Sequence, residues 1–400
     1  MKAEAPLGSG RSRLRNTFVV AQVAGSTLFL AAAFLFVRSF TNVANVDPGF
    51  DTAHTLVLEL NPSTYGYDTA RSRAFFDSLT ARVAAVPGVS KVALADRVPF
   101  YVGFPASFEI STDGTDCATV ECQRATVYGV SPGHFAALGI PLRAGRDFTA
   151  EDMKNGSAVI VSERMASQFW PGAPAVGQVF RAGKDARQYE VVGIAADVKH
   201  RTLTEQPLPY LYRPLVEPDY SQSITLIIRA AGDPRALIGA VAEQVQALDP
   251  DMPARDAKTM PQRMEMPLWQ ARTMAGFASV CGVLALILAT VGLFGVTYYA
   301  VNQRTREFGI RVALGATPRA VMSLVLREGL MLTLPGVLLG TLVALGAGRL
   351  VARMLYGLSA SDPLTFTATA ALEAAVALAA CALPAWRATR ADPMLALRQE

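Results

Sequence analysis

Four long apolar blocks interrupt an otherwise polar chain. Each is bounded by charged residues and contains at most one charge: 16–37, 273–303, 329–348 and 363–386. An α-helix rises 1.5 Å per residue, so about 20 residues cross a hydrocarbon core of roughly 30 Å. The pattern therefore predicts a membrane protein with four transmembrane helices, at about 16–38, 273–301, 329–348 and 364–386.

The polar stretch between the first two spans, residues 39–272, has the pattern of a large α+β domain. TLVLEL (55–60) and VSKVALA (89–95) are typical of strands, and Phe75, Phe76, Leu79 and Val83 recur at helical spacing between them. SITLIIRA (223–230) and the amphipathic 234–249 stretch repeat the strand-and-helix theme. We expect two strand-helix-strand halves and a smaller β-rich insertion at about 140–215.

Basic residues flank the spans unevenly, which predicts the orientation. Four lie in the N-terminal arm (1–15), five in the loop 302–328 and three in the tail, whereas the loop between the last two spans has only Arg349 and Arg353. We expect both termini and the 302–328 loop to be cytoplasmic, with residues 39–272 outside. The net charge of +4 follows from this topology and gives no reason to invoke nucleic acid.

The first block has two readings, a cleaved signal peptide or an uncleaved anchor. A signal-peptide core is about 7 to 15 residues long, whereas TFVVAQVAGSTLFLAAAFLFV runs on to Arg38 without a small-residue cleavage site. The length favours the anchor.

The outward domain contains two cysteines close together in the sequence. An outward compartment permits oxidation of Cys117 and Cys122, so we expect a disulfide there, with two free thiols as the alternative.

Residues for catalysis are missing from the sequence. The three histidines are far apart, no metal-binding or P-loop motif occurs, and we expect no cofactor and no enzymatic activity in this chain. GVSPG (129–133) matches a nucleophile elbow, but Pro132 lacks the backbone N–H that would stabilise an oxyanion. We therefore interpret Ser131 as a helix cap.

Two features of the predicted spans concern helix packing. Gly336, Gly340, Ala344 and Gly348 recur every four residues and predict a smooth face for close approach of another helix. Glu373 is an acid within the last span, where an ionised carboxylate is costly. It is either part of a proton or ion relay or a protonated side chain hydrogen-bonded inside the bundle, and we favour the second.

The stretch REFGIRVALGATPRAV (306–321) follows the second span and is basic and broken by glycines. Glu307 and Arg311 stand at i and i+4, which predicts a short amphipathic helix at the cytoplasmic surface. Thr317 and Pro318 are typical of a helix start. The alternatives are a loop attracted to anionic lipid and a docking element for a protein partner; we favour docking.

Several stretches carry a resemblance to a known family: RNTFVVAQVAGSTLFLAAAFLFVRSFTNVANVDPGFD, FAALGIPLRAGRDFTAED, AVIVSERMASQFWPGAPAVGQVF, TREFGIRVALGATPRAVMSLVLREG, LSASDPLTF and LPAWRATRADPMLALR. Together they cover nearly the whole chain and resemble the FtsX/MacB family of ABC-transporter permeases, in detail one half of the duplicated orphan permeases. The resemblance implies a MacB-like periplasmic core domain at 39–272 and an FtsX-like permease domain at 273–400 of an inner-membrane protein.

The resemblance also implies a mechanism. Such permeases work in pairs, each docked on a cytoplasmic ABC ATPase, and transmit ATP-driven motion to the outward domains for efflux or envelope-related export. The implied coupling residues are Glu307, Phe308, Gly309, Arg311, Leu314 and Gly315. A second permease unit, as a copy or a fused half, and a periplasmic adaptor are further implied partners, beside membrane lipid. The alternative function is a membrane receptor or regulator that binds a ligand or envelope enzyme without transport.

Overall fold

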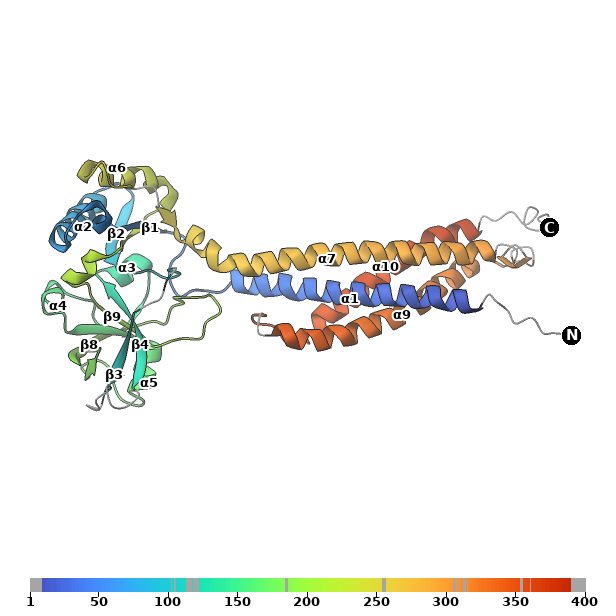
Figure 1. The fold of residues 1–400 in the computed structure, drawn as a ribbon, viewed down its shortest axis with the longest axis horizontal. Helices are drawn as coiled ribbons and strands as arrows, with labels where there is room; N and C mark the ends of the chain where they lie inside the picture. The colour runs from blue at the N-terminus through green and yellow to red at the C-terminus, as the bar shows by residue number, and fades with distance from the viewer. Residues whose placement is uncertain are drawn as a thin grey trace. The chain divides into compact units, whose positions relative to one another are not determined.

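The protein is described from a computed structural model (Figure 1). The described residues are 9–101, 103, 106–112, 117, 122–183, 186–253, 257–304, 307, 308, 310, 311, 314, 316–352, 355–359 and 361–389. They form two compact units. One is drawn from Met1–Asn45 and Leu268–Glu400, and the other from Val46–Pro267.

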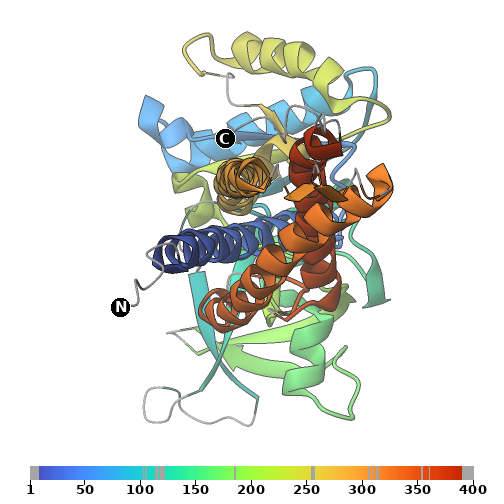
Figure 2. The same cartoon turned by 90° about the vertical axis from the view of Figure 1, so that its right-hand side faces the viewer.

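The first unit is a bundle of long helices. They are α1 (Ser9–Ala44), α7 (Met260–Gln303), α9 (Pro318–Val351) and α10 (Pro363–Thr389). Each contains a stretch long and apolar enough to cross a membrane, which confirms the four predicted spans. Figures 1 and 2 show the four helices running alongside one another. The helices extend beyond the apolar blocks; α9, for example, begins at Pro318 because the Thr317 side chain accepts a hydrogen bond from the Ala320 N–H, which confirms the predicted start.

The second unit has an α+β lobe built on four of its strands. The elements are β1 (Thr55–Leu60), α2 (Thr69–Ala84), β2 (Val89–Ala95), β10 (Ile224–Ala230), α6 (Ile238–Leu248) and β11 (Lys258–Thr259). The strand order is β11-β1-β10-β2, with antiparallel neighbours throughout. Because β10 lies between β1 and β2, each half is a split β-α-β unit. Two strand-helix-strand halves are thus confirmed in this lobe.

Periodicity explains how this lobe buries its core. Alternate residues of β1 and β10 point to one face of the sheet, as Leu56, Leu58 and Leu226 do, and α2 and α6 cover it. On α2, Phe75, Phe76, Leu79 and Val83 are all buried, and Asp68 caps the helix by accepting the Arg71 N–H. This continuous apolar core holds the lobe together.

A closed ring of strands forms the rest of the unit. Its members are β3 (Ala106–Ser111), β4 (Gln123–Val130), β6 (Ala158–Ser162), β7 (Val179–Ala182), β8 (Arg187–Ala195) and β9 (Tyr210–Pro214). Pairing runs β4-β3-β7-β8-β6-β9, and β9 pairs back with β4. Closure removes the exposed sheet edges that would invite aggregation. The ring includes β3 and β4, which lie before the expected insertion at about 140–215.

Short elements join the strands and helices of the lobe and the ring. These are η1 (Pro62–Tyr65), α3 (His134–Leu138), β5 (Leu142–Gly145), α4 (Ala150–Asn155), α5 (Glu163–Phe169), η2 (Glu217–Ser221) and η3 (Pro234–Leu237). Strand β4 belongs to both parts, because Val130 pairs with Ala95 of β2. The ring has its own apolar interior, which includes Ile110, Phe180 and Leu211.

Candidate functional site

The 302–328 segment is anchored to the bundle through Phe308. This ring is 2% exposed and packs in a cluster with Val321 and Val325 of α9 and Ala385 of α10. Its backbone N–H donates to the Arg304 carbonyl, which continues the helical path from α7. A side chain buried this deeply is out of reach of a partner. Phe308 therefore positions the segment, while other residues present its surface.

The exposed face of the 302–328 segment combines apolar and charged groups. Leu314 is 83% exposed and Ile310 42%. Beside them Arg311 donates to the Glu307 carboxylate at 2.5 Å, in the predicted i and i+4 relation. Arg304 reaches across to Glu328 of α9 at 2.6 Å. Of the residues predicted for coupling, Gly309 and Gly315 lie outside the described residues.

The glycine stripe of α9 lies against α1. A Cβ at Gly336 would come within 2.6 Å of the Val23 side chain, and one at Gly340 within 2.5 Å of Thr27. Ala344 and Gly348 on the same face are buried as well. Only glycine fits at the two closest positions, so the stripe sets the distance between the two helices.

Glu373 of α10 lies in the interior of the helix bundle. Thr27 of α1 donates its hydroxyl to one carboxyl oxygen at 2.6 Å. The other oxygen has no partner among the described residues, and a cavity of about 20 Å³ adjoins it. A space of this size holds one water molecule at most. Glu373 is therefore hydrogen-bonded inside the bundle, and its role as a protonated acid rather than part of a relay stays a prediction.

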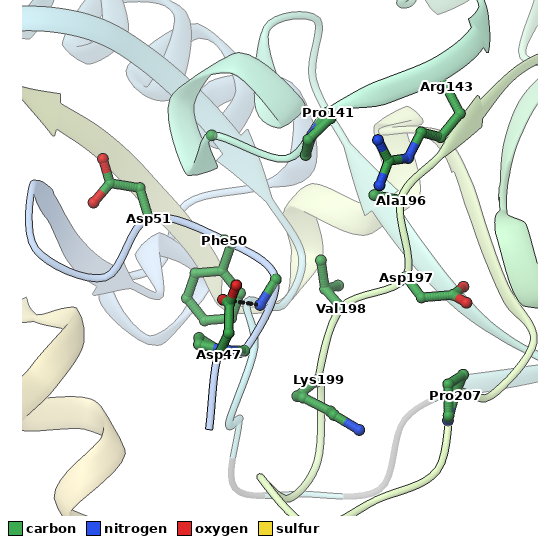
Figure 3. Close-up of a pocket in the computed structure, with 13 residues that line it drawn as sticks. Asp47, Phe50, Asp51, Pro141, Arg143, Ala196, Asp197, Val198, Lys199 and Pro207 are labelled. Atoms are coloured by element: carbon green, nitrogen blue, oxygen red, sulfur yellow. Dashed lines mark hydrogen bonds between the residues drawn. The ribbon is translucent and has the colours of Figure 1, made fainter. Parts of the chain in front are cut away.

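A pocket of about 560 Å³ opens in the second unit. In Figure 3 Asp47 and Phe50 line one side and Arg143 and Asp197 the other. Asp47 follows shortly after α1 in the chain, and Asp197 follows β8. Burial raises the pKa of Asp197, and the hydrogen bond from the Arg164 N–H partly offsets this effect.

The charged groups of this pocket already have protein partners. Arg143 pairs with Glu163 at 3.3 Å, and Lys199 donates to the Glu205 carbonyl. Each of the three aspartates also has a partner. Asp47 accepts a hydrogen bond from the Gly49 N–H, Asp51 pairs with Arg229 and His54, and Asp197 accepts a hydrogen bond from the Arg164 N–H. Because these bonds are satisfied within the protein, a ligand gains little by replacing them.

The structure corrects the interpretation of Ser131 as a helix cap. Its hydroxyl accepts the N–H of Leu94 in β2 at 2.8 Å, and Gly133 stands at the start of α3. The neighbouring His134 is fully buried, and burial lowers its pKa to about 3. Its ring nitrogens have no partner among the described residues, so the pair forms no catalytic relay. The sequence missed this because β2 approaches from a distant part of the chain.

The remaining predicted site residues are two cysteines. Cys117 and Cys122 form a disulfide in the structure, with Cα atoms 5.3 Å apart. Cys281 and Cys381 are free. Within the described residues no cluster of three or more histidine, cysteine, aspartate or glutamate side chains is placed to hold a metal ion.

Fold and geometry define a class: a membrane protein with four candidate spanning helices and an α+β domain inserted after the first of them. Two family models match the chain. The MacB-like periplasmic core domain covers residues 18–248 and the FtsX-like permease C-terminal domain covers 279–393. The chain belongs to the MacB/FtsX-like ABC-transporter permease family, as the resemblance indicated.

Curated relatives agree with this assignment. The chain is 28% identical over 341 residues to the macrolide export ATP-binding/permease protein MacB 1/2 of Paracoccus denitrificans, covering 82% of this chain and 49% of the relative. It is 26% identical over 285 residues to the uncharacterized ABC transporter permease YknZ of Bacillus subtilis, covering 69% of this chain and 70% of that protein. The chain thus spans about half the length of the MacB relative.

Solved structures of outward domains are also similar. The extracellular domain of YknZ from Gram-positive bacteria aligns with a TM-score of 0.33 and 17% identity, over 48% of this chain and 91% of that one. The periplasmic region of MacB from Actinobacillus actinomycetemcomitans gives a TM-score of 0.35 and 17% identity, over 56% of this chain and 97% of that one.

Proposed function

We propose that this chain is the permease subunit of an ATP-binding cassette system, in which a partner ATPase docks on the 302–328 segment and its motion reaches the outward domain for efflux or envelope-related export. ATP hydrolysis then belongs to the partner. The observation that carries the proposal is the segment itself: Phe308 fixes it to α9 and α10, while Leu314 and Ile310 stay exposed.

This arrangement suits transmission of a force. A docked partner pushes on the exposed residues, and the buried Phe308 passes the load to the helices it contacts. The Arg304–Glu328 and Glu307–Arg311 pairs hold the segment's charged groups in place. The names of the MacB relatives join an ATP-binding part and a permease in one protein, which supports a partner of this kind here.

Further partners and the orientation belong to the same proposal. A second permease unit, either a copy of this chain or a fused half, and a periplasmic adaptor complete the assembly. The bundle lies in lipid of the inner membrane, with both termini cytoplasmic and residues 39–272 outside. The large apolar side chains exposed along α7 suit contact with lipid or with the second unit.

The test is affinity purification from native membranes in mild detergent, with bound proteins identified by mass spectrometry. Leu314→Asp places a charge on the docking face. Leu350→Asp is the matched control, because Leu350 is 86% exposed at the other end of α9. We expect a P-loop ATPase to copurify with the parent and the control, and its recovery to fall at least tenfold with Leu314→Asp.

Two results would overturn the proposal. If no ATPase copurifies with the parent protein, the receptor or regulator alternative takes its place and the outward domain is tested for ligands. If the ATPase binds the Leu314→Asp and Leu350→Asp proteins equally, docking occurs elsewhere on the chain.

A further inference from the structure

The strand ring has an open mouth that differs from the pocket of Figure 3. A cavity of about 670 Å³ lies at one end of the ring, where β3 and β8 begin and β7 and β9 end (β3, β8 and β9 are labelled in Figure 1). Phe108, Arg187, Tyr189 and Arg213 line it, each on the same strand face as a core residue of the ring. Mouths of small β-barrels are common ligand sites.

One guanidinium at this mouth, that of Arg187, differs from its neighbours in its partners. Arg213 pairs with both oxygens of Asp219 at 2.7 Å, and Arg124 pairs with Glu109 at 2.8 Å. Arg187 has no carboxylate within ion-pair distance among the described residues; one nitrogen donates to the Asn155 carbonyl at 2.9 Å. The Arg187 guanidinium retains N–H donors suited to an anion, and a carboxylate matches its fork geometry.

Backbone and aromatic groups shape the space around Arg187. A Cβ at Gly156 would lie 3.0 Å from its Nη2, so glycine leaves room for the guanidinium there. The ring of Phe108 is half-buried and lies tilted beside Tyr189, with the two ring centroids 6.4 Å apart, and the Tyr189 ring lies 5.7 Å from the guanidinium carbon of Arg187. An apolar surface thus adjoins the free charge.

We propose that this mouth binds an amphipathic carboxylate, with the carboxylate on Arg187 and a flat apolar body against Phe108. In the pocket of Figure 3, by comparison, the Arg143 guanidinium is paired with Glu163, and the only cation there without a carboxylate partner among the described residues is the compact ammonium group of Lys199, which donates to the Glu205 carbonyl. The proposal does not depend on an ATPase partner, because it concerns only residues of the outward domain.

The test uses the full chain in lipid nanodiscs, with empty nanodiscs subtracted, and 2-naphthoate as the probe in calorimetric titrations. Arg187→Gln removes the charge inside the mouth. Arg181→Gln is the matched control, because Arg181 of β7 points outward between the buried Phe180 and Ala182. We expect Arg187→Gln to weaken binding at least tenfold and Arg181→Gln to leave it unchanged. The neutral 2-naphthamide should bind at least tenfold more weakly than 2-naphthoate, and linear octanoate should also bind less tightly.

The results also define what would refute the site. Equal binding by the Arg187→Gln and Arg181→Gln proteins, or equal binding of naphthoate and naphthamide, would show that the probe sits elsewhere. Absence of binding to the parent protein at millimolar probe would overturn the proposal. Tighter binding of octanoate than of naphthoate would reject the flat apolar body. Far-ultraviolet circular dichroism of each variant checks that the fold is retained.

Discussion

The two units of this protein differ in the residues that they bury. The outward lobe packs large apolar side chains such as Phe76, Leu79 and Ile228 into its core. The helix bundle also buries many small and polar ones, including Thr27, Thr333 and Gly340, while many of its large apolar residues lie on the surface. Those exposed residues include Phe277, Leu284, Leu288, Leu338 and Leu342.

The difference follows from the solvent around each unit. In water, burial of apolar area contributes roughly 25 cal/mol per Å², so large side chains move inside. In lipid this term is lost between helices, and close packing through small residues together with interhelical hydrogen bonds takes its place. The bundle's interior is accordingly held by glycine contacts and the Thr27–Glu373 bond.

The largest expected effect comes from replacing one phenylalanine by alanine in each unit and comparing the two losses of stability. Phe76→Ala empties a fully buried site in the outward lobe, and we expect the free energy of unfolding to fall by about 3 to 5 kcal/mol. Phe277→Ala on α7 removes a ring that is 71% exposed, with an expected loss below about 0.5 kcal/mol. Denaturant unfolding of the full chain in detergent measures both. Equal losses would contradict the comparison.

A buried carboxyl in the outward domain gives the next effect. Burial raises the pKa of Asp96 to about 6, an effect that Arg97 opposes, and one carboxyl oxygen has no partner among the described residues. Because this pKa lies above that of the unfolded chain, ionised Asp96 disfavours folding. The penalty is absent below about pH 4 and grows as the pH rises through about 6.

Asp96→Asn should therefore stabilise the protein at pH 8 by about 2 kcal/mol and leave its stability almost unchanged at pH 4. The measurement is the thermal unfolding midpoint of the parent and the variant across this range. Asp77→Asn, which removes an exposed carboxyl from α2, is the control and should show no such trend. A shift that is the same at every pH would contradict the burial argument.

The glycine stripe of α9 provides the third effect. Gly340→Leu would force a side chain into Thr27 and the Ala24 carbonyl, where a Cβ alone comes within 2.6 Å of each. We expect a loss of about 1 to 3 kcal/mol through separation of α1 and α9. Gly346→Leu on the same helix is the control, because nothing lies within 4 Å of its Cβ position. Equal unfolding midpoints for the two variants would show that the stripe does not set the packing.

Local patterns accounted for the membrane spans and for most of the outward lobe. The alternation in TLVLEL and VSKVALA predicted strands with the bounds of β1 and β2, and the spacing of Phe75 to Val83 predicted α2. Strand-type alternation and helical spacing are local properties of the chain, so the sequence predicts these elements directly. Ring closure left no such signal, because Thr126 of β4 pairs with Tyr210 of β9 far along the chain.

The sequence by itself determined where this chain crosses the membrane and which residues form helices and strands, because hydrophobic period and length act locally. Only the tertiary structure decided the roles of individual side chains. Phe308 is an anchor because α9 and α10 meet around it, and the folding of the ring leaves Arg187 without a carboxylate partner among the described residues. Contacts between distant residues set burial and charge pairing, and a local pattern does not encode them.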